Sequence, residues 1–232
     1  MESLSLTDLE REALALSLRV SLWAVAGSLP LGIAVAWLLA RRNFPGKVLV
    51  DGLVHMPLVL PPVVTGYMLL VTLGRRGVVG QYLYDWFGVQ FAFTWKAAAV
   101  ASAVMAFPLM VRAIRLSMES VDRGLEQAAR TLGASPVRVF ATVTLPLVGP
   151  GVLTGVILAF ARSLSEFGAT ITFASNIPGE TRTLPLALYT LTQVPGGDAA
   201  AFRLCVISAL LALAALVASE LLARRMQKRL KG

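Results

Sequence analysis

The feature that most constrains this chain is a set of long apolar runs that contain almost no charged residues. Residues 20–40 include no Asp, Glu, Lys or Arg over 21 positions, and residues 145–161 are equally free of charge. A helix of about 20 residues rises about 30 Å, which matches the hydrocarbon core of a bilayer. The runs therefore predict an all-α protein whose helices cross a membrane.

Composition supports this prediction. The chain is 56% hydrophobic and 15% charged, whereas about a quarter of the residues of a soluble domain are charged. We expect one membrane domain over residues 1–232, and a segment at 184–191 would add a sixth span only if it dips into the bilayer. The predicted spans are about five in number and cover residues 14–40, 48–73, 92–111, 145–173 and 203–223.

Prolines interrupt the second predicted span. Pro57, Pro61 and Pro62 each remove a backbone N–H and clash with the preceding turn, so this segment cannot be one straight helix. The break has two interpretations, a packing kink or a discontinuity that turns backbone groups and Thr65 toward a transport path. His55, the single histidine, lies in an apolar stretch, and we interpret it as a packed residue rather than a proton relay.

The region 112–144 is a polar, basic interruption between two apolar runs. A stripe at helical spacing and a glycine that can end a helix predict a first short helix, capped by Ser120 and ending at Gly133. Ser135 followed by Pro136 predicts the start of a second helix. The residues expected on the buried sides of the two helices are Leu125, Ala128, Ala129 and Leu132, then Val137, Phe140 and Ala141.

Basic residues are divided unevenly between the two sides that five spans define. The loop after the first span, the central loop and the C-terminal tail carry 13 Lys and Arg residues, whereas the opposite side carries 7. The positive-inside rule then places the central loop and the C-terminus in the cytoplasm and the N-terminus on the outer side. The net charge of +8 is explained by these span ends, so it does not indicate nucleic acid as a partner.

The chain shows no sequence signature of an enzyme. It contains no G-x-x-x-x-G-K-[ST] phosphate-binding loop, no cluster of metal ligands and no histidine–nucleophile arrangement, and Cys205 is its only cysteine. We therefore expect no catalytic residue, no metal and no cofactor bound by this chain. Any ATP-driven work requires a partner.

The best candidates for a transport path are polar residues at membrane depth. Arg162 and Glu166 are four residues apart on an expected helix, and such charges are costly in a membrane unless they pair or line a wet cavity. The alternative is an ion pair at headgroup level that only ends the span. The full candidate set for the pathway and gate is Pro61, Pro62, Thr65, Arg162, Ser165, Glu166 and Thr170.

Part of the central loop resembles the EAA loop of ABC importer permeases. Ala128, Ala129 and Gly133 match that pattern, as do Val143, Leu145 and Pro146, while Gln127 stands at the usual glutamate position and the acid comes one residue earlier. In the family this cytoplasmic loop docks on a separate ATPase subunit. The resemblance thus implies a coupling role for Glu126, Gln127, Ala128, Ala129, Gly133, Ala134 and Pro146.

Four other blocks resemble the molybdate permeases of type I ABC importers, namely residues 56–67, 85–88, 160–173 and 175–185. The resemblance implies a homodimer in the bacterial inner membrane, surrounded by lipid, with two cytoplasmic ATP-binding subunits and a periplasmic molybdate-binding protein. ATP and Mg would belong to the ATPase. Molybdate is the expected substrate and tungstate a second candidate. The alternatives are a sulfate/thiosulfate permease, whose family shares the block at 175–185, and a membrane protein that works without an ATPase.

Overall fold

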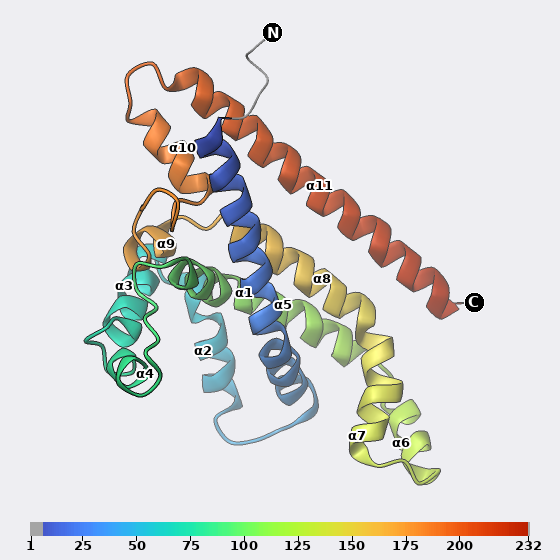
Figure 1. The fold of residues 1–232 in the computed structure, drawn as a ribbon. Coiled ribbons are helices and arrows are strands. Elements are labelled where there is room, and N and C mark those ends of the chain that lie inside the picture. The colour runs from blue at the N-terminus through green and yellow to red at the C-terminus, as the bar shows by residue number, and fades with distance from the viewer. Residues whose placement is uncertain (1–6, 232) are drawn as a thin grey trace.

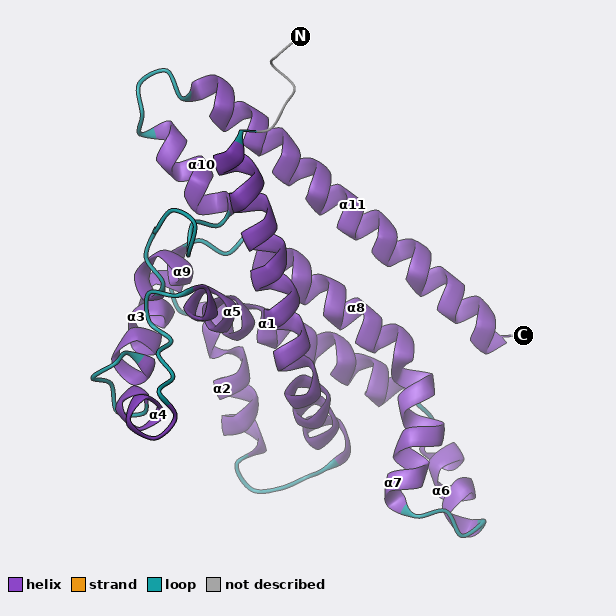
Figure 2. Ribbon diagram, viewed as in Figure 1, coloured by secondary structure: helices purple, strands orange, loops and turns teal. Residues whose placement is uncertain are grey.

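A computed structural model describes residues 7–231, so the ends of the expected 1–232 domain, residues 1–6 and 232, lie outside the described residues. Within the described range every regular element is helical, which confirms the all-α prediction (Figures 1 and 2). The first helix, α1 (Asp8–Arg41), begins with a capping box. Thr7 accepts a hydrogen bond from the backbone N–H of Glu10, and the Glu10 side chain accepts one from the backbone N–H of Thr7.

The second predicted span is broken, as its prolines require. The chain bends by 115° between helix α2 (Lys47–Val59) and helix α3 (Pro62–Leu73). Leu60 and Pro61 between them have extended backbone, which is the conformation that a following proline favours. The bend directs α3 away from α2 and toward the short helix α4 (Gly80–Phe87), at the left of Figure 1.

The centre of the fold is helix α5 (Trp95–Ser120), which packs against α1 and against helix α8 (Leu145–Leu164). The core between them contains Leu39, Met110, Ile114 and Val148, all of them fully buried. Small residues along α5, such as Ala97 and Ala101, allow its neighbours to approach closely, as is usual for helices packed within membranes.

Between α5 and α8 the chain forms a knob of short helices at the opposite end of the molecule from the N-terminus (Figure 1). It consists of α6 (Arg123–Thr131), α7 (Pro136–Val139) and one π-helical segment, η2 (Phe140–Thr144), which leads directly into α8. The π-helical segment was not predicted. We call residues 122–144 the knob below.

The expected helix over residues 145–173 is interrupted. Helix α8 ends at Leu164, and a separate helix α9 (Gly168–Phe173) follows after three residues. The interruption brings the backbone of Gly168 against α3, where an added β-carbon would lie 2.9 Å from Cβ of Pro62. The contact joins residues that are more than 100 positions apart, so the local sequence does not reveal it.

Two helices complete the fold, α10 (Leu184–Thr192) and α11 (Asp198–Lys231). Helix α10 is too short to span a membrane, and it packs between α1 and α11 through Leu184 and Ala187. Among the described residues four helical stretches are long and apolar enough to cross a membrane, and the bent pair α2–α3 would be a fifth. This agrees with the predicted number of about five.

Candidate functional site

The break between α8 and α9 holds the charged pair that the sequence indicated. Nη1 of Arg162 lies 2.7 Å from Oε2 of Glu166. The Glu166 side chain is 1% exposed, whereas that of Arg162 is 25% exposed. The other carboxylate oxygen of Glu166 accepts a hydrogen bond of 2.8 Å from the backbone N–H of Ala169 and so fixes the start of α9. The pair is thus a buried anion held by a cation that remains accessible.

Three hydroxyl groups surround this break without a hydrogen-bond partner among the described residues. They belong to Thr65 on α3, Ser163 on α8 and Thr170 on α9, and all three residues are buried. Buried hydroxyls in proteins almost always find a partner, so these three call for an explanation. They are donors that a transported anion could use, and Ser163 lies in the same polar stretch of sequence as Arg162 and Glu166.

The remaining pathway candidates divide between this junction and the surface. Pro62 is exposed, but its Cβ lies close to Gly168 at the α3–α9 contact. Pro61 is exposed and forms the bend. Ser165 is exposed as well, and its hydroxyl donates to the backbone oxygen of Arg162 at 3.1 Å. The structure therefore brings Pro62, Thr65, Arg162, Glu166 and Thr170 to one junction and leaves Ser165 and Pro61 at its edge.

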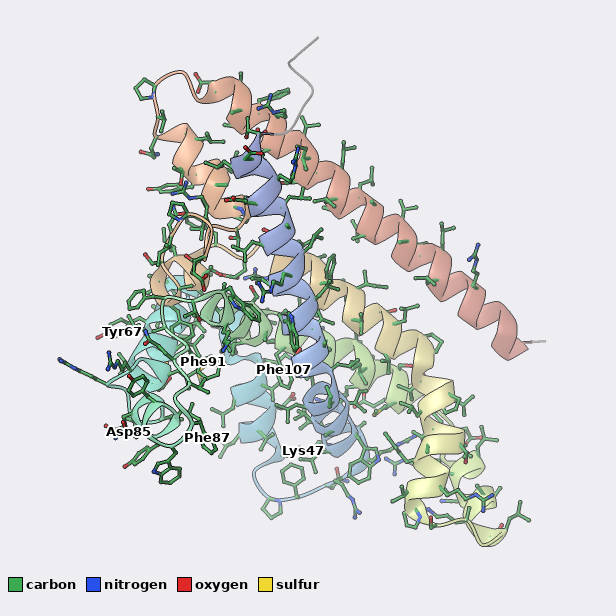
Figure 3. The ribbon with its side chains drawn as sticks, in the orientation of Figure 1. Lys47, Tyr67, Asp85, Phe87, Phe91 and Phe107 are labelled. Atoms are coloured by element: carbon green, nitrogen blue, oxygen red, sulfur yellow. The ribbon has the colours of Figure 1, made fainter. Side chains whose placement is uncertain are left out.

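A cavity of about 920 Å³ lies between α1, α2 and α5, away from the Arg162–Glu166 pair. Its lining is aromatic and aliphatic, and Phe91 and Phe107, labelled in Figure 3, are part of it. Ser28 and Lys96 are the only lining residues with polar side chains besides the ring nitrogens of the tryptophans. A cavity with so few donors is poorly suited to an oxyanion, although a lipid tail or an apolar partner helix would fit it.

His55 is half-buried, and its ring contacts a polar residue of its own helix. Its Nδ1 lies 2.8 Å from the backbone oxygen of Asp51 and 3.2 Å from the carboxylate of the same residue. Arg115 on α5 bridges Asp51 and Glu119 at 3.1 and 2.8 Å. Asp51 lies one turn before His55 on α2, and Arg115 reaches Asp51 from α5, so His55 lies beside a polar contact between the two helices.

The knob contains the predicted helix–glycine–helix turn, but the cap of its first helix differs from the prediction. Asp122, not Ser120, caps α6, since Ser120 is the last residue of α5. Gly133 has φ +85° in the left-handed region, as predicted, and Ser135 accepts a hydrogen bond from the backbone N–H of Arg138 at the start of α7.

Most of the apolar stripe of the knob is exposed rather than buried, although Phe140 packs against the core as expected. Leu132 is 88% and Val137 78% exposed, and Leu125 also faces outward. The buried residue of α7 is Val139, which the sequence pattern did not select. Of the other predicted coupling residues, Gln127, Ala128, Gly133 and Pro146 are exposed, and Glu126, Ala129 and Ala134 are half-buried. The knob therefore presents an uncovered apolar surface.

Glu126 has partners that the sequence gave no means to identify. Its carboxylate pairs with Arg41 at the end of α1, and the hydroxyl of Thr144 in η2 donates to the same oxygen. Arg41 directly follows the first charge-free run, where the sequence indicates only a basic span end. No local spacing relates it to Glu126, because the two residues are 85 positions apart.

The chain thus combines several helices of membrane-spanning length with a broken span and a protruding group of short helices. Residues 28–228 match the family model of the binding-protein-dependent transport system inner membrane component, and the chain belongs to this family. It is therefore a multi-pass component of the inner membrane.

Individual relatives show which transport systems the chain is similar to. The chain is 64% identical over 224 residues to the molybdenum transport system permease protein ModB of Escherichia coli (strain K12), covering 97% of this chain and 98% of that protein. It is 35% identical over 218 residues to the sulfate transport system permease protein CysW of a Synechocystis strain, covering 93% and 77%. A solved bacterial ABC transporter that imports the polysaccharide alginate shares the fold, with a TM-score of 0.75, 18% identity, and coverage of 95% and 80%.

Proposed function

We propose that this chain is the membrane-spanning subunit of an ATP-driven importer of molybdate, with tungstate as a second possible substrate. The observation that carries the proposal is the 64% identity to a molybdenum transport permease over 97% of the chain. The sulfate permease is a more distant relative at 35% identity. Sulfate or thiosulfate is thus the weaker candidate.

The junction of α3, α8 and α9 suits a path for an oxyanion. It offers the buried, unpartnered hydroxyls of Thr65, Ser163 and Thr170 as neutral donors, next to the accessible guanidinium of Arg162. Glu166 already neutralises much of the positive charge of Arg162. Neutral donors and a compensated cation can bind an anion without trapping it, which transport requires.

The knob suits the docking of a separate ATPase. The chain carries no phosphate-binding loop, and the apolar side chains of Leu125, Leu132 and Val137 are uncovered in the monomer. Exposed apolar clusters of this kind mark protein interaction sites. We propose that the chain itself is not an enzyme and that ATP and Mg bind to the partner ATPase. If the chain worked without an ATPase, the exposed apolar residues of the knob would have no binding partner.

The proposed assembly is a homodimer of this chain with two cytoplasmic ATP-binding subunits and a periplasmic molybdate-binding protein. The N-terminus would face the periplasm, and the knob and the C-terminus the cytoplasm. The distribution of Lys and Arg supports this orientation. The arrangement in Figure 1 is compatible with it, because the N-terminus and the knob lie at opposite ends of the molecule.

The test is uptake of labelled molybdate by cells that carry all partner subunits, with and without this chain. Excess unlabelled sulfate is added in a parallel sample and excess tungstate in a third. Uptake that requires the chain and persists in sulfate supports the proposal, and competition by tungstate extends it to that anion. Uptake abolished by sulfate would favour a sulfate permease, and uptake independent of the chain would refute transport by it.

A further inference from the structure

We infer that Arg41 is a positioning residue for energy coupling, which locks the knob to the end of α1 through Glu126 so that the two move as one body. The inference rests on the proposed function. It concerns how movement of the knob reaches the membrane helices, whichever oxyanion is transported.

The contact itself is close and largely shielded from water. Nη2 of Arg41 donates to Oε1 of Glu126 over 2.9 Å, and the two side chains are only 8% and 16% exposed. Surface ion pairs contribute little to structure, because water and salt screen them. A shielded pair behaves differently, since separating its members leaves an uncompensated charge in a poorly hydrated place. The pair therefore resists opening.

A third element joins at the same oxygen. The hydroxyl of Thr144 donates to Oε1 of Glu126 over 2.8 Å, and Thr144 is 2% exposed. Thr144 is the last residue of the π-helical segment η2, and π-helical turns within helices occur frequently at functional sites. One carboxylate oxygen thus connects the end of α1, the knob helix α6 and the entry to α8.

The position of the acid on α6 fits this inward role. Glu126 is half-buried and points to Arg41, while the next residue, Gln127, is exposed. Adjacent residues on a helix are rotated by about 100° from each other, so they cannot serve the same surface. The exposed residue, Gln127, is therefore neutral, whereas the carboxylate of Glu126 makes a contact within the chain.

The mechanical consequence follows from the connections of the knob. Along the chain the knob is joined to the membrane helices only at its two ends, to α5 and to α8. Without the contact to Arg41, a force on the knob could be absorbed by flexing at these two connections. With the contact, the same force also reaches α1, which packs along α5 and α8.

The first experiment uses the complete transporter in liposomes and measures ATP hydrolysed per molybdate imported. Arg41→Glu and Glu126→Arg are compared with the double exchange, with Arg41→Lys, and with Arg42→Glu as an exposed neighbouring control. We expect each single reversal to lower uptake roughly tenfold and to raise the ATP cost per ion. The double exchange and Arg41→Lys should recover uptake. Normal coupling in Arg41→Glu, or no recovery in an assembled double exchange, would overturn the inference.

The second experiment requires no transported ion, so it separates this inference from the proposed substrate. Spin labels are placed at Asn43 and Arg130, both exposed, in the assembled complex with Cys205 replaced by serine. The distance between the labels should stay narrow with and without ATP in the parent protein and broaden in Arg41→Ala. An equally narrow distribution in Arg41→Ala would show that the contact does not hold the knob. Failure of molybdate import with this distance result intact would refute only the substrate.

Discussion

Gly66 of α3 and Ala169 of α9 touch backbone to backbone. A β-carbon on Gly66 would lie 2.6 Å from the carbonyl oxygen and 2.8 Å from the α-carbon of Ala169. Neither atom can move out of the way without moving α9. Helices α3 and α9 can therefore approach this closely only because Gly66 has no side chain.

Gly66→Ala should destabilise the assembled transporter by about 1–3 kcal/mol, the usual cost of overpacking, and should reduce uptake. Gly52→Ala is the matched control, because Gly52 is also within a helix and no atom lies within 4 Å of its added β-carbon. Thermal unfolding of the purified complexes checks this prediction. Equal melting temperatures for the two variants would show that the α3–α9 contact is loose.

The hydroxyl groups of Thr65 and Thr170 should matter for transport more than for stability. Because they have no protein partner, replacing both threonines with valine removes no hydrogen bond, and the stability should change by less than about 1 kcal/mol. Uptake should nevertheless fall.

Thr181→Val is the contrasting control for this pair. Thr181 is fully buried, accepts a hydrogen bond from the backbone N–H of Ile177 and donates to the backbone oxygen of Ser175. Its replacement should destabilise by about 1–3 kcal/mol. If the valine variants at 65 and 170 transport normally, these hydroxyls do not line the path.

The Arg162–Glu166 pair allows a direct test of its two interpretations. Arg162→Gln alone leaves the buried carboxylate of Glu166 unpaired and should destabilise by about 3 kcal/mol. The double change to glutamine at both positions should restore stability, because no charge is left unpaired. A purely structural pair would then allow uptake to recover too. We expect uptake to stay low, as measured with labelled molybdate.

Gly133→Glu should abolish transport while the protein still inserts into the membrane. The left-handed backbone of Gly133, at φ +85°, costs most residues about 1–2 kcal/mol, and the added charge would lie on the docking surface of the knob. Gly133→Asn is the control, since asparagine tolerates this conformation, and it should keep most activity. Uptake is compared with the amount of chain in isolated membranes. Normal uptake by the glutamate variant would eliminate the coupling role of the knob.

Local physics made several features readable from the sequence. The charge-free runs predicted membrane helices, because a bilayer accepts little else over 20 residues. Pro61 and Pro62 predicted the break at the start of α3, and Gly133 and Ser135 predicted the left-handed turn and the cap within the knob. Each of these depends on a residue and its immediate neighbours.

The other features required the tertiary structure. The approach of Gly168 to α3 and the pairing of Arg115 on α5 with Asp51 on α2 both join segments that are far apart in the chain. The stripe on the knob looked like a buried face, yet its leucines are exposed, because periodicity shows that one side of a helix is apolar and not what covers it.

The sequence alone thus determined the class of fold, the break in the second span and the local shape of the knob. Only the tertiary structure decided which distant groups meet: Arg41 with Glu126 across 85 residues, and Gly66 with Ala169. The physical reason is that capping, helix breaking and membrane insertion act over a few residues or one span. Pair contacts depend on how all the helices pack together.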